Sequence, residues 1–130
     1  MKKISTLLIA VALALAACKG PASEAPAFPI SDAGKTIEVA AGNEFKIVIE
    51  SNPSTGYHWD LIGELDENIL QFVSTEYRAD EPVLPGSGGR EAWTFQAVAP
   101  GEATIVLGYY PPSNDTVEPA QTVTFTIVVK

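Results

Sequence analysis

Few side chains in this sequence could carry out catalysis, and their spacing matches no catalytic motif. His58 is the single histidine of the 130-residue chain, so a Ser-His-Asp triad would have to be built around it, and no serine lies in a Gly-x-Ser-x-Gly turn. One histidine and one cysteine are too few for a zinc site. The chain has sixteen Asp and Glu residues, so a pair of catalytic carboxylates is an open alternative, although no pattern favours one. We therefore expect a binding protein without metal ion or cofactor, rather than an enzyme.

The only cysteine, Cys18, directly follows a segment with the features of an export signal. Two lysines near the start precede an apolar stretch, which is too short for a helix spanning a bilayer because that needs about 20 residues. The ending Leu15-Ala16-Ala17-Cys18 resembles the lipobox of bacterial lipoproteins, which implies that residues 1–17 are removed and Cys18 carries the lipid. The alternative is an ordinary signal-peptidase site that leaves Cys18 as a free thiol.

These features predict a location in the bacterial cell envelope. We expect the chain to be held at the membrane through the lipid on Cys18 only. Lys19 rather than aspartate follows that cysteine, and the resemblance to enteric lipoproteins implies the outer membrane, facing the periplasm. Removal of the signal changes the formal charge from -8 to -10, because the signal carries two lysines and no acid. Such an acidic chain is a poor binder of nucleic acid, so we expect no nucleic-acid partner.

Composition divides the exported chain into a spacer and one domain. Residues 18–29 are rich in Pro, Ala, Ser and Gly, which is typical of a flexible spacer. Residues 30–130 alternate apolar and polar side chains, with turn residues between the alternating runs. The clearest run places Val123, Phe125, Ile127 and Val129 opposite threonines. Seven strands are predicted, at residues 36–40, 44–50, 57–62, 69–75, 91–97, 102–109 and 122–130.

Each predicted strand has one apolar and one polar face, which favours two antiparallel sheets packed face to face. At this length and strand number we expect an all-β, immunoglobulin-like sandwich, with a small barrel as the alternative. Trp59 and Trp93 lie on the apolar faces of their strands, so we expect both in the core. His58 lies on a polar face, where we expect it in solvent.

Three connections between the predicted strands have unusual chemistry. The first, 52–56, combines a proline that restricts φ with a glycine that permits a positive φ, which favours a single shape. The second, 79–90, contains Gly86-Ser87-Gly88-Gly89 without the lysine of a phosphate-binding loop. The third, 110–115, places a tyrosine beside two prolines, which is typical of an adhesive surface. Taken alone, the three could equally be a rigid turn, a flexible loop and a stiff linker.

Together, the connections resemble those of the chagasin family of cysteine-peptidase inhibitors. Asn52-Pro53-Ser54-Thr55-Gly56-Tyr57, with Trp59 downstream, is similar to the family's Asn-Pro-Thr-Thr-Gly-Tyr-x-Trp. Gly86-Ser87-Gly88-Gly89 before Trp93-Thr94-Phe95 is similar to its Gly-x-Gly-Gly and aromatic strand. Pro100-Gly101-Glu102-Ala103-Thr104 also fits. The resemblance covers nearly the whole predicted domain.

The resemblance implies a reversible, non-covalent inhibitor of papain-family cysteine peptidases, whose three neighbouring loops enter the active-site cleft. In the third loop, Tyr109-Tyr110-Pro111-Pro112-Ser113 replaces the family's Tyr-x-Arg-Pro-Trp, which implies weaker binding. The competing hypothesis is an envelope binding or assembly module with a non-peptidase partner. We expect a monomer. The implied contact residues are Asn52, Pro53, Ser54, Thr55, Gly56, Tyr57, Gly86, Ser87, Gly88, Gly89, Tyr109, Tyr110, Pro111 and Pro112.

Overall fold

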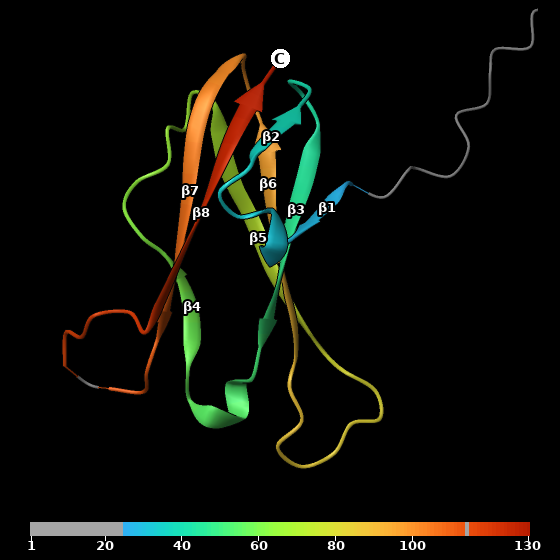
Figure 1. Ribbon diagram of the computed structural model, residues 1–130. Coiled ribbons are helices and arrows are strands. Elements are labelled where there is room, and N and C mark those ends of the chain that lie inside the picture. The colour runs from blue at the N-terminus through green and yellow to red at the C-terminus, as the bar shows by residue number, and fades with distance from the viewer. Residues whose placement is uncertain (1–24, 114) are drawn as a thin grey trace, which may run out of the picture.

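A computed structural model describes residues 25–113 and 115–130, which form two four-stranded sheets around one core (Figure 1). The predicted signal, Cys18 and most of the predicted spacer therefore lie outside the described residues. Two short 3-10 helices, η1 (Ile30–Asp32) and η2 (Pro53–Thr55), accompany the strands. The strands are β1 (Ala27–Pro29), β2 (Thr36–Val39), β3 (Glu44–Ser51), β4 (His58–Leu61), β5 (Leu70–Ala79), β6 (Gly89–Ala97), β7 (Gly101–Tyr110) and β8 (Gln121–Val129).

The two sheets have the strand orders β1-β3-β6-β5 and β2-β8-β7-β4. This arrangement confirms the predicted immunoglobulin-like sandwich. The prediction that all strand pairs are antiparallel was wrong at two edges, because β1 pairs parallel with β3 and β2 pairs parallel with β8. The chain places β1 at the edge of one sheet and, after η1, β2 at the edge of the other. Parallel pairing depends on this long-range path, which local alternation does not encode.

Strand β1 lies within the stretch that the composition assigned to the spacer. Residues 27–29 pair with 46–48 of β3, and the ring of Phe28 packs edge-on against Phe45, with ring centroids 6.3 Å apart. The folded domain thus begins before residue 30, and its described residues form eight strands instead of the predicted seven. A strand of three residues is too short to show alternation, so its pairing with β3 is what identifies it.

The core contains the apolar faces of both sheets. On β8, the alternating residues Val123, Phe125, Ile127 and Val129 are all buried, as their spacing predicted. Both tryptophans are also in the core, where Trp59 is 5% and Trp93 6% exposed. The alternation along most strands therefore reports which side chains lie between the sheets.

Strand β5 departs from this rule. It runs four residues beyond the predicted end, to Ala79, and every residue from Gln71 to Arg78 is exposed. The strand is at a sheet edge and pairs with β6 alone, with a bulge between Phe72 and Ser74. The prediction of one buried face was therefore wrong for this strand.

In the described part of the chain, no helix has the length and apolar character needed to cross a membrane.

Candidate functional site

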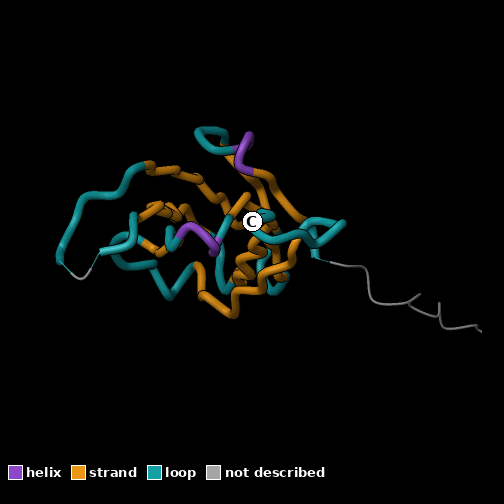
Figure 2. Tube along the Cα trace, turned by 90° about the horizontal axis from the view of Figure 1, so that it is seen from below, coloured by secondary structure: helices purple, strands orange, loops and turns teal. Residues whose placement is uncertain are grey.

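The three chemically unusual connections lie at the same end of the sandwich (Figure 1). The strand ladders explain why, because the last residue of β3, Ser51, pairs with Gly89 at the start of β6, and Gly89 pairs with Ala79 at the end of β5. In the other sheet, the start of β4 pairs with the end of β7, which pairs with the start of β8. Figure 2, which views this end, shows η2 between the two longer loops. We call 52–57 the central loop, 80–88 the second loop and 110–120 the third loop.

Hydrogen bonds within the central loop hold it in one conformation. Thr55 and Gly56 donate their backbone N–H groups to the carbonyls of Asn52 and Pro53, at 3.1 and 3.0 Å, which closes the single turn of η2. The Ser54 hydroxyl donates to Asn52 Oδ1 at 2.5 Å. The Thr55 hydroxyl donates to the Asn52 carbonyl at 2.7 Å and accepts from the N–H of Tyr57 at 3.2 Å. The exposed loop is therefore ordered by its own side chains.

The turn ends at Gly56, whose φ of +83° is in the left-handed region. Glycine adopts this conformation without the steric strain that a β-carbon causes. A β-carbon at Gly56 would also lie 2.9 Å from the β-carbon of Pro112 in the third loop. The site therefore requires glycine for two separate reasons.

Asn52 joins the central loop to the second loop. Its Nδ2 donates to the carbonyl of Gly86 at 3.1 Å, across 34 positions of sequence. The backbones are close at this point, because a β-carbon at Gly88 would lie 3.3 Å from the Ser51 carbonyl oxygen. The central loop thus contacts the second loop on one side and Pro112 of the third loop on the other.

The second loop has its own hydrogen bonds. The N–H of Ser87 donates to the Leu84 carbonyl at 3.0 Å, and the Ser87 hydroxyl accepts from the N–H of Leu84 at 3.1 Å. At the loop base, Asp80 donates its N–H to the Gly88 carbonyl at 3.0 Å. A β-carbon at Gly89 would collide with the Arg78 carbonyl oxygen. The predicted glycine motif thus permits close approach between backbones, in addition to any role in binding.

Below the central loop, aromatic side chains connect the loop to the core. The ring of Tyr109 lies between Tyr57 and Trp59, with ring centroids 5.0 and 4.8 Å away. Trp59 Nε1 donates to the Glu50 carbonyl at 3.0 Å, which links β4 in one sheet to β3 in the other. Tyr57 and Tyr109 are partly buried, whereas residues 53–56 are exposed. Of the predicted contact residues, these two tyrosines support the loop rather than form its tip.

The predicted histidine position is confirmed. His58 is exposed, lies 3.1 Å from Asp60 through Nε2, and stacks on Tyr110 with ring centroids 5.7 Å apart. Among the described residues, no three His, Cys, Asp or Glu side chains are grouped so that they could hold a metal ion.

Most of the chain matches known proteins. The family model described as chagasin family peptidase inhibitor I42 matches residues 38–128, which include all three loops. The chain belongs to the chagasin family. Amoebiasin-1 of Entamoeba histolytica is 35% identical over 79 residues, which cover 59% of this chain and 74% of that protein. Chagasin of Trypanosoma cruzi is 34% identical over 82 residues, which cover 61% of this chain and 74% of that protein.

Solved structures support the same fold. The crystal structure of a cysteine protease inhibitor from Entamoeba histolytica superimposes with a TM-score of 0.68 at 24% sequence identity. The match covers 81% of this chain and 95% of that one. At this identity the likeness establishes the fold, while membership of the chagasin family rests on the family model and the relatives.

One exposed feature of the three loops was not predicted. Val83 and Leu84, in the second loop, are 69% and 61% exposed, the highest values among the large apolar side chains that the structure describes as exposed. The glycines that follow them were predicted as contact residues, whereas this pair was not. Two adjacent apolar residues in a proline- and glycine-rich loop, outside any alternating run, are the signal that could have identified them.

Proposed function

We propose that this chain is a reversible, non-covalent inhibitor of papain-like cysteine peptidases, and that its three loops together fill the active-site cleft. The observation that carries this proposal is the central loop, which is ordered by its own hydrogen bonds and contacts both neighbouring loops. Membership of a family of peptidase inhibitors supports it. An inhibitor of this kind acts by occupying the cleft and is not an enzyme.

The order that the loops already have in the free protein favours tight binding. Ordering a flexible side chain or loop on association costs about 0.5–1.5 kcal/mol per immobilised side chain, which reduces affinity. In the central loop, Ser54 and Thr55 already have hydrogen-bond partners in the free protein. Little ordering remains for the complex, so more of the contact energy contributes to affinity.

The three loops contain hydroxyls, amides, prolines and glycines. Their described residues include no thiol or other reactive group. Inhibition would therefore depend on blocking access to the catalytic cysteine of the peptidase. Val83 and Leu84 add exposed apolar area beside the central loop, where they can pack against a wall of the cleft. Burying one such side chain contributes about 1.5–3 kcal/mol.

Titration of papain with the chain lacking residues 1–17 and carrying Cys18→Ser tests this proposal. We expect complete, reversible inhibition, weakened at least tenfold, or about 1.4 kcal/mol, by Thr55→Arg, because the substitution brings a long charged side chain into the cleft. The matched control is Thr104→Arg, at an exposed position on β7 outside the loops, which should leave inhibition unchanged. Equal inhibition by both variants would remove the central loop from the interface.

The second candidate is an envelope binding module with a non-peptidase partner. It is favoured by the third loop, which has Pro111 and Ser113 where the chagasin family has arginine and tryptophan. Arginine and tryptophan are common hot-spot residues, and their absence removes contact area. Failure of the folded chain to inhibit both papain and cathepsin L would favour this module over the inhibitor.

We further propose that the inhibitor is monomeric and is held in the bacterial envelope by a lipid on Cys18, on the periplasmic face of the outer membrane. The first described residues support a tether that leaves the loops free, because Ala27 pairs with Lys46, five positions before the end of β3 at the central loop. We expect Cys18→Ser to abolish membrane attachment and leave the domain folded. Detergent-phase partitioning and membrane fractionation, with Ser23→Ala as the control, measure this. A Cys18→Ser protein that stays fully membrane-bound would disprove lipidation.

A further inference from the structure

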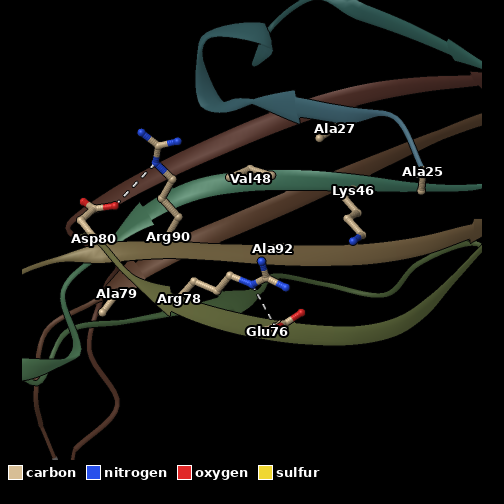
Figure 3. A pocket seen from close by; sticks show the side chains of 10 residues that line it. All are labelled: Ala25, Ala27, Lys46, Val48, Glu76, Arg78, Ala79, Asp80, Arg90 and Ala92. Atoms are coloured by element: carbon tan, nitrogen blue, oxygen red, sulfur yellow. Dashed lines mark hydrogen bonds and ion pairs between the residues drawn. The ribbon is translucent and has the colours of Figure 1, made fainter. Parts of the chain in front are cut away.

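The outer face of the β1-β3-β6-β5 sheet has a groove that the proposed inhibition does not use, lined by three basic side chains and by the acidic Glu76 and Asp80. Three of the five Lys and Arg residues in the described part of this acidic chain, Lys46, Arg78 and Arg90, line one groove (Figure 3). The groove has a volume of about 300 Å³. The remaining two, Lys35 and Lys130, lie elsewhere and pair with Asp32 and Glu38 at 3.2 and 2.9 Å.

The strand register explains why the three side chains line one groove. Val48, Ala92 and Glu76 form one row across β3, β6 and β5. Arg90 and Arg78 lie in the next row on one side, and Lys46 lies in the next row on the other. Because Val48 and Ala92 are small, the long basic side chains can extend over them. In Figure 3, Lys46 and Arg78 lie to either side of Ala92.

The two arginines are direct cross-strand partners, since Arg78 pairs with Arg90 in the β5-β6 ladder. Like charges at opposed positions destabilise a sheet unless something compensates for them. Arg78 Nε contacts Glu76 at 3.2 Å and Arg90 Nε lies 4.0 Å from Asp80. All four side chains are more than half exposed, so these pairs contribute little to stability.

Both ion pairs leave binding capacity in the groove. Each uses the Nε of the guanidinium, so the Nη groups of Arg78 and Arg90 have no hydrogen-bond partner among the described residues. Lys46 has no acidic group within 4.0 Å in the same part of the chain. Guanidinium and ammonium groups that surround a small cavity bind oxyanions, and arginine is especially suited to phosphate.

We propose that this groove binds a phosphate group, with Lys46, Arg78 and Arg90 donating to its oxygens above Val48 and Ala92. A tetrahedral phosphate can present oxygens to three cations from different strands at once, whereas one guanidinium already satisfies a planar carboxylate. The strong negative charge of the whole chain disfavours polyanions, so the ligand is a single phosphate ester or ion rather than nucleic acid. Ala25 and Ala27 also line the groove, which places it where the chain enters the domain.

NMR titration of the unlipidated chain with inorganic phosphate, at low ionic strength, tests the site. We expect saturable shifts at Lys46, Arg78 and Ala92. Lys46→Gln combined with Arg78→Gln should weaken binding about tenfold, because two charged donors are lost. The matched control, Lys35→Gln with Lys130→Gln, should change it less than twofold. Non-saturating shifts that occur equally at Lys35, Lys130 and the three groove residues would overturn the proposal.

A second experiment distinguishes the two possible sources of the phosphate group, a lipid headgroup and a free phosphate ester. Sedimentation with vesicles of phosphatidylcholine, with and without phosphatidylglycerol, separates a lipid headgroup from a free phosphate ester. If the chain binds the anionic vesicles, and the combined Lys46→Gln and Arg78→Gln changes abolish this binding, the phosphate belongs to a lipid headgroup. Saturable binding of inorganic phosphate without vesicle binding identifies a free ester. The double variant should inhibit papain as the parent does, so the groove and the inhibitory loops can fail independently.

Discussion

The central and third loops lie side by side and are ordered in different ways. The central loop has hydrogen bonds from Ser54, Thr55 and Asn52 within or beside a single helical turn. In the third loop, the described residues have one side-chain hydrogen bond, from the Asp115 N–H to Ser113 Oγ at 3.1 Å. Its base is closed by the Ala120 N–H donating to the Tyr109 carbonyl at 2.7 Å. The comparison indicates that the central loop is rigid by itself, whereas the third depends on its ends and on Pro112.

Among the substitutions considered, Gly56→Val should weaken inhibition most, because it affects both the central and the third loop. The substitution forces a β-branched residue to a φ of +83° and places its β-carbon 2.9 Å from Pro112, so both loops must move. We expect the inhibition constant for papain to rise about a hundredfold, which corresponds to about 2.7 kcal/mol.

The matched control is Gly63→Val. Gly63 also has a positive φ, +74°, but a β-carbon there would contact nothing within 4 Å. This variant should lose stability in thermal unfolding and retain inhibition once folded. Equal losses of inhibition in both variants would show that strain anywhere in the domain, rather than the contact between the loops, controls binding.

Pro111→Arg combined with Ser113→Trp tests whether the third loop can regain contacts that the chagasin family has there. Arginine and tryptophan at an interface contribute about 2 kcal/mol or more each when they fill pockets. We expect affinity for papain to improve by about 1–3 kcal/mol, mainly through slower dissociation, because related interfaces differ chiefly in off-rate. Surface plasmon resonance measures both rates.

An unchanged off-rate in this double variant would contradict the expectation. In that case the two prolines give the third loop a different path, and the new side chains point into solvent. Pro111 and Ser113 line a shallow groove together with His58 and Asp60, which gives the new side chains a surface on this molecule as well. Arg and Trp in that groove would reduce the gain.

Asn52→Ala should have a smaller effect, because it removes two hydrogen bonds of one side chain and leaves the backbone turn in place. The variant loses the hydrogen bond to the Gly86 carbonyl and the acceptor for the Ser54 hydroxyl. We expect about fivefold weaker inhibition, or about 1 kcal/mol, which is the usual net contribution of a hydrogen bond. Asn68→Ala, at an exposed position outside the loops, is the control. Unchanged inhibition constants would mean that the second loop is positioned by its backbone alone.

His58→Ala should change inhibition less than twofold. The side chain is exposed, and its partners Asp60 and Tyr110 are themselves outside the central loop. Inhibition kinetics at neutral pH measure the effect. A loss above tenfold would place the outer face of β4 in the interface and extend the contact surface beyond the loops.

Much of the architecture could be predicted from local patterns. Alternation located six of the eight strands to within two residues at each end, and it placed Trp59 and Trp93 in the core. It was wrong for β5, which is an edge strand that runs on to Ala79 and is exposed from Gln71 to Arg78. Strand β1 was missed because only its partner β3 reveals it.

The candidate site, too, could be predicted only in part from local patterns. The types and order of residues in 52–57, 86–89 and 109–112 were sufficient to suggest a chagasin-like set of loops. Their mutual contacts were not visible in the sequence. Asn52 reaches Gly86 and Gly56 meets Pro112 across dozens of intervening residues, and no local pattern encodes those distances.

The sequence by itself determined the all-β class, the core faces of most strands and a central loop whose proline, glycine and hydroxyls favour one conformation. These properties depend on neighbours within a few positions, where φ preferences, alternation and short-range hydrogen bonds act. Only the tertiary structure decided that the three loops touch, that β5 is exposed, and that Lys46, Arg78 and Arg90 share a groove. Those relations arise from the register between strands distant in sequence, because pairing brings such residues together.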